Sequence, residues 1–260
     1  MIYLRSFTFP SLASRELFIN DIKRTCYTTV YPFHLFALQE LPRFTFEPIT
    51  IFCGGNGCGK STLLNVLSCL DAADGGQLEI CGKTVDGSHR QICRIRREDI
   101  AFIFQGYNLI SSLTALENVE LGLKYRKVPR ARRKVLAHKA LCQVGMEERC
   151  GYLPHQLSGG QQQRVAIARA VVLCPRILFC DEPTGNLDGA SAKLVLDKIM
   201  ELKERGTLVV MITHDMSLLP LADRVFVLEN GKLKEHSSAP ASLNTDTENP
   251  GTNLPADKKR

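Results

Sequence analysis

The sequence predicts an α/β fold in which helices cover both faces of a mostly parallel β-sheet. The first observation is a set of short apolar segments, at residues 100–104, 176–180 and 207–213, with the composition of fully buried strands. The second is that helical patterns separate these segments, and strands that alternate with helices form parallel sheets. The third is a glycine-rich loop at residues 54–59, placed between a predicted strand and a predicted helix.

The remaining strands are predicted from turn residues and side-chain alternation. Residues 44–52 alternate aromatic and β-branched side chains around Pro48, which predicts a strand, a tight turn and a second strand. Residues 224–228 and 232–234 flank Asn230-Gly231 and predict a closing hairpin, because Asn-Gly favours the turn that two adjacent antiparallel strands need.

The helical pattern is continuous in the middle of the chain. Helices are expected from residue 61 to about 70 and over residues 191–205. Residues 115–144 are also mostly helical, with a break or first turn at Pro129, and residues 161–173 continue the pattern. Since no convincing strand lies in this region, residues from about 110 to 160 are expected to form a separate helical lobe.

Composition excludes several classes of protein. The chain has 260 residues, of which 44% are hydrophobic and 23% charged, as in soluble globular proteins. No segment approaches the roughly 20 apolar residues of a membrane-spanning helix, and the first residues lack the pattern of a secretory signal. The ten cysteines contain no Cys-x-x-Cys pair, which favours free thiols in a reducing cytosol. The net charge of +6 lies largely in two basic runs, typical of solvated helix faces, so no nucleic acid is expected.

The glycine-rich loop predicts a nucleotide phosphate site. Residues 54–61 match the pattern G-x-x-x-x-G-K-[ST] of a P-loop NTPase, in which backbone N–H groups and a helix N-terminus bind phosphate. Lys60 would bridge the β- and γ-phosphates, Ser61 would bind Mg²⁺, and Thr62 would donate to the α-phosphate. The predicted ATP-binding residues are Gly54, Gly55, Asn56, Gly57, Cys58, Gly59, Lys60, Ser61 and Thr62.

Two further sites follow from residue type and position. Asp181 ends a buried apolar strand, so its carboxylate would point toward the phosphates and hold Mg²⁺ through water. Ser158, Gly159 and Gly160 precede a helix that runs from Gln161, and a hydroxyl with bare N–H groups at a helix start forms a second anion site.

The segment Leu157-Ser158-Gly159-Gly160-Gln161 resembles the signature of ATP-binding cassette (ABC) ATPases, in which one subunit's signature closes the ATP site of its partner. The resemblance extends from about residue 54 to residue 235. The sequences of residues 104–110, 113–119 and 161–170 resemble those of the macrolide- and lipoprotein-exporter group of bacterial ABC ATPases. In that group, the surface that follows the Q-loop receives a segment of a membrane subunit.

The resemblance assigns roles to individual residues. Glu182 matches the general base that polarises the attacking water. His214 matches the switch histidine, and it would lie near the γ-phosphate if the strands 176–180 and 207–213 are neighbours. Gln105 matches the Q-loop glutamine, which reaches Mg²⁺ and the water. Asp188 matches the D-loop, and Ser158, Gly159, Gly160 and Gln161 would bind the γ-phosphate of ATP held by a second subunit.

These matches imply an ATP-hydrolysing subunit of an ABC transporter, with ATP and Mg²⁺ as its ligands. Two copies, or one copy and a paralogue, would form a head-to-tail dimer whose closure drives a transmembrane permease, with export of lipoprotein, peptide or drug as the expected activity. The expected location is the cytoplasm, peripheral on the inner face of the cell membrane. The nucleotide-binding domain would span residues 1–235, and the polar residues 236–260 would form a disordered tail.

The first 50 residues depart from this family, with residues 1–43 as its atypical N-terminal segment. Residues 11–40 contain several aromatic residues without a clear counterpart for adenine stacking, among them Phe18, Tyr27, Tyr31, Phe33 and Phe36. Residues 3–7 and 44–52 look more like AAA-type or recombination-type P-loop ATPases. The alternative function is therefore a soluble ABC-type or AAA-type ATPase that acts on DNA or another macromolecule. Against it, only about 100 residues separate the phosphate loop from the signature, without sustained heptads.

Overall fold

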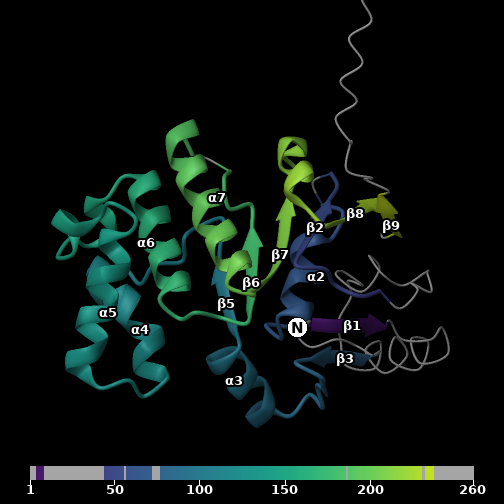
Figure 1. Cartoon of the computed structure of the whole chain (residues 1–260), viewed down its shortest axis with the longest axis horizontal. Coiled ribbons are helices and arrows are strands. Elements are labelled where there is room, and N and C mark those ends of the chain that lie inside the picture. The colour runs from purple at the N-terminus through teal and green to yellow at the C-terminus, as the bar shows by residue number, and fades with distance from the viewer. Residues whose placement is uncertain are drawn as a thin grey trace, which may run out of the picture.

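The computed structural model describes residues 4–8, 44–55, 57–71, 77–185, 187–229 and 232–236. Its centre is a six-stranded sheet with the strand order β5-β6-β7-β2-β8-β9 (Figure 1). Neighbouring strands run parallel except for β8 and β9, which form an antiparallel hairpin. The strand bounds are β2 Ile49–Cys53, β5 Ile100–Ile103, β6 Ile177–Asp181, β7 Leu208–Thr213, β8 Arg224–Glu229 and β9 Lys232–His236. The predicted α/β fold is confirmed.

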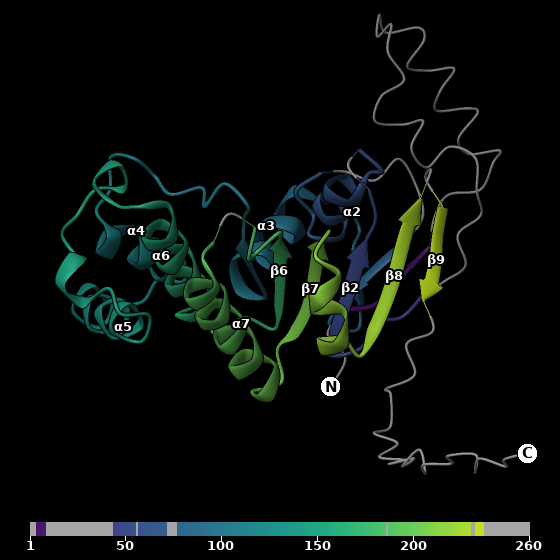
Figure 2. The same cartoon turned by 90° about the horizontal axis from the view of Figure 1, so that it is seen from above.

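The central strands contribute to two hydrophobic cores, one on each face of the sheet. In β6, Leu178 packs into one core with side chains of the helices α4 to α7, while the next residue, Phe179, packs into the other with side chains of α2. This alternation follows from the period of two in a strand. Figure 2 accordingly shows α2 (Lys60–Leu67) and α3 (His89–Glu98) on one side of the sheet and α7 (Gly189–Glu204) on the other.

A second, three-stranded sheet lies beside the first. Strand β1 (Leu4–Thr8) pairs antiparallel with β3 (Gln77–Ile80), which pairs antiparallel with β4 (Lys83–Thr84). The sequence predicted a small antiparallel part but not β3, β4 or α3. These elements carry a weak hydrophobic pattern, since α3 has Ile95 as its single buried residue.

The predicted strand–turn–strand over residues 44–52 is wrong in its first strand. Phe44 forms an isolated bridge, and residues 45–48 belong to neither helix nor strand. The Thr50 hydroxyl accepts a hydrogen bond from the N–H of Glu47 at 3.0 Å, which closes a turn before β2. Phe44 and Phe46 are buried against Phe52, with ring centroids 6.1 and 6.3 Å away. Their alternation thus reflects aromatic packing and not a pleated strand.

The helical lobe lies to one side of the sheet (Figures 1 and 2). It contains α4 (Ala115–Tyr125), α5 (Arg130–Cys142), the short 3₁₀ turns η2 (Glu147–Arg149) and η3 (Pro154–Gln156), and the first part of α6 (Gly159–Val171). Pro129 is the N-cap residue of α5, so the helical pattern is interrupted at this proline as the sequence predicted. A further 3₁₀ helix, η4 (Met216–Leu221), connects β7 to β8.

Several expectations lie outside the described residues: the aromatic segment 11–40, Asn56, the turn Asn230-Gly231 and the tail after residue 236. Within the described part of the chain, no helix combines the length and the apolar character that crossing a bilayer requires.

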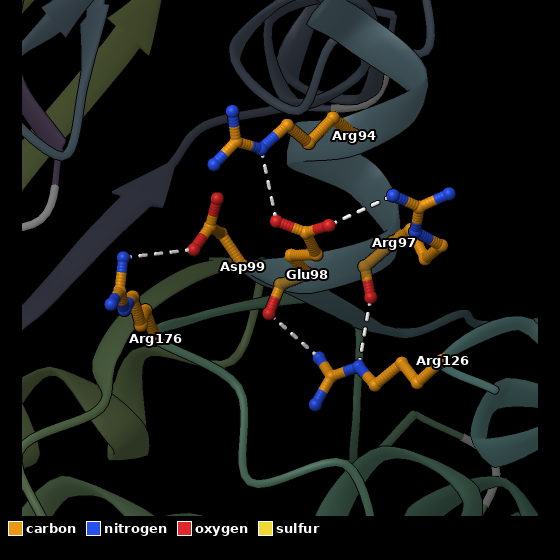
Figure 3. Close-up of polar contacts among 6 residues, drawn as sticks. All are labelled: Arg94, Arg97, Glu98, Asp99, Arg126 and Arg176. Atoms are coloured by element: carbon orange, nitrogen blue, oxygen red, sulfur yellow. Dashed lines mark hydrogen bonds and ion pairs between the residues drawn. The ribbon is translucent and has the colours of Figure 1, made fainter. Parts of the chain in front are cut away.

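Arg126 joins the helical lobe to the sheet domain (Figure 3). Its guanidinium donates to the carbonyls of Arg97 at 2.8 Å and Glu98 at 2.9 Å, at the C-terminal end of α3, and to the carbonyl of Leu173 after α6. Terminal helix carbonyls have no intrahelical partner, so this one side chain satisfies groups from two elements. Burial lowers the pKa of Arg126, and the neighbouring charges of Cys174, Asp99 and Glu98 oppose that shift.

Replacing Arg126 should therefore destabilise the protein far more than replacing another arginine of the same cluster. Arg126→Ala removes all three of these charge-assisted hydrogen bonds between the lobe and the sheet domain, and we expect a loss of about 2–3 kcal/mol in the free energy of unfolding. Arg94 forms only an exposed i,i+4 ion pair with Glu98, so Arg94→Ala should cost less than about 0.5 kcal/mol. Urea unfolding of both variants measures the difference, and equal losses would contradict the assigned role of Arg126.

Candidate active site

The sequence-predicted site residues come together at one edge of the parallel sheet. The phosphate loop follows β2, Asp181 ends β6, His214 follows β7 and Gln105 lies two residues after β5. Because β5, β6, β7 and β2 are consecutive and parallel, their carboxyl ends share an edge, which is where ligands bind in open α/β sheets.

The phosphate loop is shaped by glycine geometry and by Lys60. Gly57 and Gly59 have φ angles of 76° and 98°, which L side chains rarely adopt. Lys60 begins α2 and is 7% exposed, and its ammonium donates to the carbonyls of Gly54 at 2.7 Å and Gly55 at 2.8 Å. The lysine charge is thus held inside the loop, while Ser61 is exposed at the first turn of α2.

Asp181 is a half-buried carboxylate beside a second carboxylate. Burial raises its pKa, the charge of Glu182 raises it further, and the ammonium of Lys60 partly opposes both. A bound divalent cation would favour the ionised form by the same Coulomb argument. The available donors are the hydroxyl of Ser61, the carboxylate of Asp181 and the amide of Gln105. Hard oxygen ligands of this kind suit Mg²⁺.

Glu182 and His214 are in direct contact. The Oε1 of Glu182 lies 2.8 Å from the Nδ1 of His214, and its Oε2 accepts a hydrogen bond from the hydroxyl of Thr213 at 3.3 Å. The Glu182 side chain is 11% exposed and that of His214 is 63% exposed. The strands β6 and β7 are neighbours as expected, with Asp181 opposite Ile212. The N–H of Glu182 also donates to the carbonyl of Ile212 at 3.0 Å, so the backbone fixes where this carboxylate lies.

Gln105 is exposed in a turn that is fastened to α6. Beyond it, Tyr107 and Asn108 have φ angles of 61° and 48°, unusual for residues other than glycine. Arg169 of α6 donates to the carbonyls of Asn108 at 2.6 Å and Tyr107 at 2.8 Å. A Cβ on Gly159 would lie 3.0 Å from the Tyr107 hydroxyl, so the Q-loop also contacts the start of the signature helix.

The signature residues form the N-terminus of α6. Ser158 is the N-cap, and its hydroxyl accepts a hydrogen bond from the N–H of Gln161 at 3.3 Å. The Gln161 side chain accepts in return from the N–H of Ser158 at 3.0 Å. This reciprocal capping box fixes the first turn. The signature belongs to the helical lobe and lies apart from α2, which carries this chain's own phosphate loop (Figures 1 and 2).

Asp188 is placed next to the signature. It caps α7, with Oδ1 accepting from the N–H of Ser191 at 2.9 Å and Oδ2 from the Ser191 hydroxyl at 2.9 Å. These hydrogen bonds from the Ser191 N–H and hydroxyl lower the pKa of Asp188. Arg164 of α6 donates to the same hydroxyl at 3.3 Å, and a Cβ on Gly160 would lie 3.4 Å from it.

Sequence reasoning missed several residues that position these loops: Gln163, Arg164, Arg169 and Ser191. Gln163 is buried and donates to the carbonyl of Pro183 at 2.8 Å, which ties α6 to the segment after Glu182. The spacing Asp188-x-x-Ser191 before a helical run is a recognisable capping signal. The other three partner with backbone carbonyls or a hydroxyl of distant residues, and no sequence pattern marks such contacts.

The family model for the ABC transporter matches residues 44–185, more than half of the chain. The chain belongs to the ABC transporter family. The match starts at residue 44, so residues 1–43 lie outside it, whereas residues 44–50, which were also expected to depart from this family, lie inside it.

Curated relatives of the chain carry names from the ABC transporter family, among them a macrolide exporter. The chain is 43% identical over 194 residues to the macrolide export ATP-binding/permease protein MacB of Rhodospirillum rubrum, a match covering 74% of the chain and 30% of that protein. It is 45% identical over 183 residues to an uncharacterized ABC transporter ATP-binding protein of Methanocaldococcus jannaschii, a match covering 70% of the chain and 82% of that protein. The chain thus spans under a third of the MacB protein's length.

Solved structures agree with this assignment. The dimeric post-hydrolysis state of the ATP-binding cassette MJ0796, bound to ADP and Pi, superposes with a TM-score of 0.73 at 31% identity. The match covers 91% of this chain and 98% of that one. The chain is therefore an ABC-type ATPase cassette, and the alternative of an AAA-type ATPase is not favoured.

Adding a methyl group at Gly54 should disrupt the phosphate loop, while the same change at Gly55 should be tolerated. A Cβ on Gly54 would lie 2.2 Å from the carbonyl oxygen of Leu228 in β8, whereas no heavy atom of the described residues, other than the chain neighbours, lies within 4 Å of one on Gly55. Relief of the clash must move backbone of β2 or β8, so Gly54→Ala should lose at least about 2 kcal/mol of stability.

Thermal or urea unfolding of the two variants measures the effect. Gly55→Ala should unfold within about 0.5 kcal/mol of the unmodified chain. A Gly54→Ala variant of unchanged stability would contradict the close approach of the loop to β8.

Proposed function

We propose that this chain binds ATP with Mg²⁺, hydrolyses it, and uses the resulting dimer motion to drive a transmembrane permease. The observation that carries the proposal is the contact between Glu182 and His214 at the sheet edge that also presents Lys60 and Asp181. A base, a partner that orients it, a phosphate-binding lysine and a metal carboxylate are the groups that phosphoryl transfer to water requires.

The roles follow from the chemistry of each group. Lys60 and the N–H groups of the phosphate loop would hold the β- and γ-phosphates. Glu182 would orient a water molecule and accept its proton as the water oxygen attacks the γ-phosphorus. The bond from that phosphorus to the bridging oxygen breaks, which leaves ADP and inorganic phosphate. Mg²⁺, held by Ser61, Asp181 through water, and Gln105, would neutralise charge on the phosphate oxygens. His214 would hold Glu182 in position.

The signature points to a second subunit. Ser158, Gly159, Gly160 and Gln161 form an anion-binding helix start on the helical lobe, away from α2. We therefore infer a head-to-tail dimer with a second copy or a paralogue, in which this helix start binds the γ-phosphate of the partner's ATP and Asp188 lies at the interface. The relative MJ0796 is described as dimeric, which supports this arrangement.

The permease would contact the surface that follows the Q-loop. Ile110 lies there with 42% of its surface exposed, although it is a large apolar residue. Asn118 of α4 holds this segment rigidly, because its amide donates to the carbonyls of Ile110 at 3.1 Å and Leu113 at 2.9 Å and accepts from the N–H of Ile110 at 2.8 Å. We place the chain at the cytoplasmic face of a membrane, bound to a permease whose exported substrate is a lipoprotein, peptide or drug.

Glu182→Gln should abolish turnover and preserve ATP binding. Glutamine keeps the size of the side chain and removes the charge that accepts a proton, so the steady-state rate should fall by about 100-fold or more. The control is Glu204→Gln, since Glu204 is exposed at the end of α7 and should not affect the rate. ATP affinity is measured alongside by equilibrium binding. Full activity in Glu182→Gln would overturn the assignment of the base.

Ile110→Asp should separate the chain from its permease and leave basal ATP hydrolysis intact. A charge at this exposed apolar position opposes burial against a partner. The control is Val135→Asp, at an exposed apolar residue of α5 that is 68% exposed. Copurification from membranes with a permease, followed by comparison of the two variants, tests the proposal. Tight binding to DNA in place of a permease would contradict the transport function.

A further inference from the structure

A second potential ligand site lies in the helical lobe, at the C-terminal end of α5. His138 and Cys142 occupy adjacent turns of this helix, and the Sγ of Cys142 lies 3.5 Å from the Nδ1 of His138. Glu147, in the turn η2, completes a group in which one ligand atom from each residue lies within 4.8 Å of the others. Helix α5 lies in the helical lobe, far from α2 and the phosphate loop that precedes it (Figures 1 and 2).

The chain reversal that brings Glu147 beside Cys142 is rigid. After α5, the N–H of Met146 donates to the carbonyl of Leu141 at 2.9 Å, and the N–H of Gly145 donates to that of Cys142 at 3.0 Å. Gly145 has a φ angle of 68°, which glycine adopts readily and which ends the helix. Leu141 and Met146 are at most 1% exposed, so they anchor the turn in the core while the three polar groups lie outside it. The backbone that carries the ligands is therefore preorganised.

We propose that His138, Cys142 and Glu147 bind a single divalent cation of the zinc class. An imidazole nitrogen, a thiolate sulfur and a carboxylate oxygen are the three ligand types of zinc, and water from the exposed side would complete a tetrahedron. Bond lengths of about 2.0 Å to nitrogen and 2.3 Å to sulfur place two tetrahedral ligands roughly 3.5 Å apart. The separation of 3.5 Å between His138 and Cys142 matches that requirement without movement of the helix.

The ligand set also selects against other abundant cations. Mg²⁺ and Ca²⁺ prefer sites built from oxygen, and this group offers one carboxylate with a thiol and an imidazole. His138 and Glu147 are exposed, so an ion can enter from solvent, and both side chains are free to adjust to it. The bound ion would tie the end of α5 to the turn that follows it and so stabilise the helical lobe.

A second His–Cys pair of the chain shows what Glu147 adds to the first. On α3, His89 and Cys93 have the same spacing, and both imidazole nitrogens lie 3.7 Å from the Sγ of Cys93. Among the described residues, this pair is not part of any group of three possible ligands, whereas the α5 pair is. Helix spacing alone therefore gives two ligands at α3, and Glu147 gives the third at α5.

Cobalt titration of the reduced, metal-free chain without nucleotide tests the proposal. Co²⁺ replaces zinc, and a thiolate ligand produces a charge-transfer absorption. We expect one ion per chain with this absorption. Cys142→Ser should remove the absorption, and His138→Ala and Glu147→Gln should each weaken binding by about tenfold or more. The double variant His89→Ala with Cys93→Ser should bind as the unmodified chain does.

Competition with Zn²⁺ and thermal unfolding provide a second readout. Zn²⁺ should displace Co²⁺ and raise the melting temperature of the unmodified chain and of the α3 double variant, but not that of Cys142→Ser. Unchanged melting temperatures of the metal-free variants show that each one folds. The proposal is overturned if the absorption persists in Cys142→Ser, if Glu147→Gln binds as tightly as the unmodified chain, or if the α3 substitutions abolish binding.

Discussion

The parallel register between β6 and β7 is the constraint on which the active site depends. Asp181 pairs with Ile212, and the N–H of Glu182 continues the ladder by donating to the carbonyl of Ile212 at 3.0 Å. That register sets Glu182 beside Thr213 and His214. The register also decides which side chains enter each of the two cores, because Leu178 and Phe179 of β6 face opposite sides of the sheet. A slip by one residue would exchange the core faces and separate Glu182 from His214, so the packing energy of the two cores maintains the contact between these side chains.

Helix α6 relates the separate loops of the site to one another. Arg169 donates to the carbonyls of Tyr107 and Asn108 after Gln105, Arg164 donates to the Ser191 hydroxyl beside Asp188, and Gln163 donates to the carbonyl of Pro183, next to the proposed base Glu182. All three side chains belong to α6, the helix whose N-terminus is formed by the signature residues. The segments that would surround this chain's own γ-phosphate are therefore bonded to the helix that would bind the partner's. A shift of the segments around one nucleotide would therefore move the helix that would bind the other nucleotide, because charge-assisted hydrogen bonds connect them.

The extent to which the sequence predicted the structure depended on the strength of each local signal. The continuous apolar strands β6 and β7 were predicted within one residue, because burial on both faces leaves an unmistakable composition. Helix α3 was missed, since it is rich in arginine and buries only Ile95. Among the site residues, sequence motifs identified the side chains that we propose contact the nucleotide. The sequence did not predict Arg126 or Arg169, whose partners are carbonyls far along the chain.

The aromatic cluster explains how an unusual N-terminal segment can precede a regular cassette. The ring centroid of Phe44 lies 5.2 Å from that of Phe226 in β8, and Phe226 stacks on Phe52 of β2 with ring centroids 5.3 Å apart. Strand β2 leads directly into the phosphate loop. From Phe44 onward the chain thus belongs to the core that supports the loop, and the family match begins at that residue. Upstream, β1 is joined to β3 by antiparallel backbone pairing. Backbone hydrogen bonds impose little on side-chain identity, so the sequence of β1 can diverge while the sheet is kept.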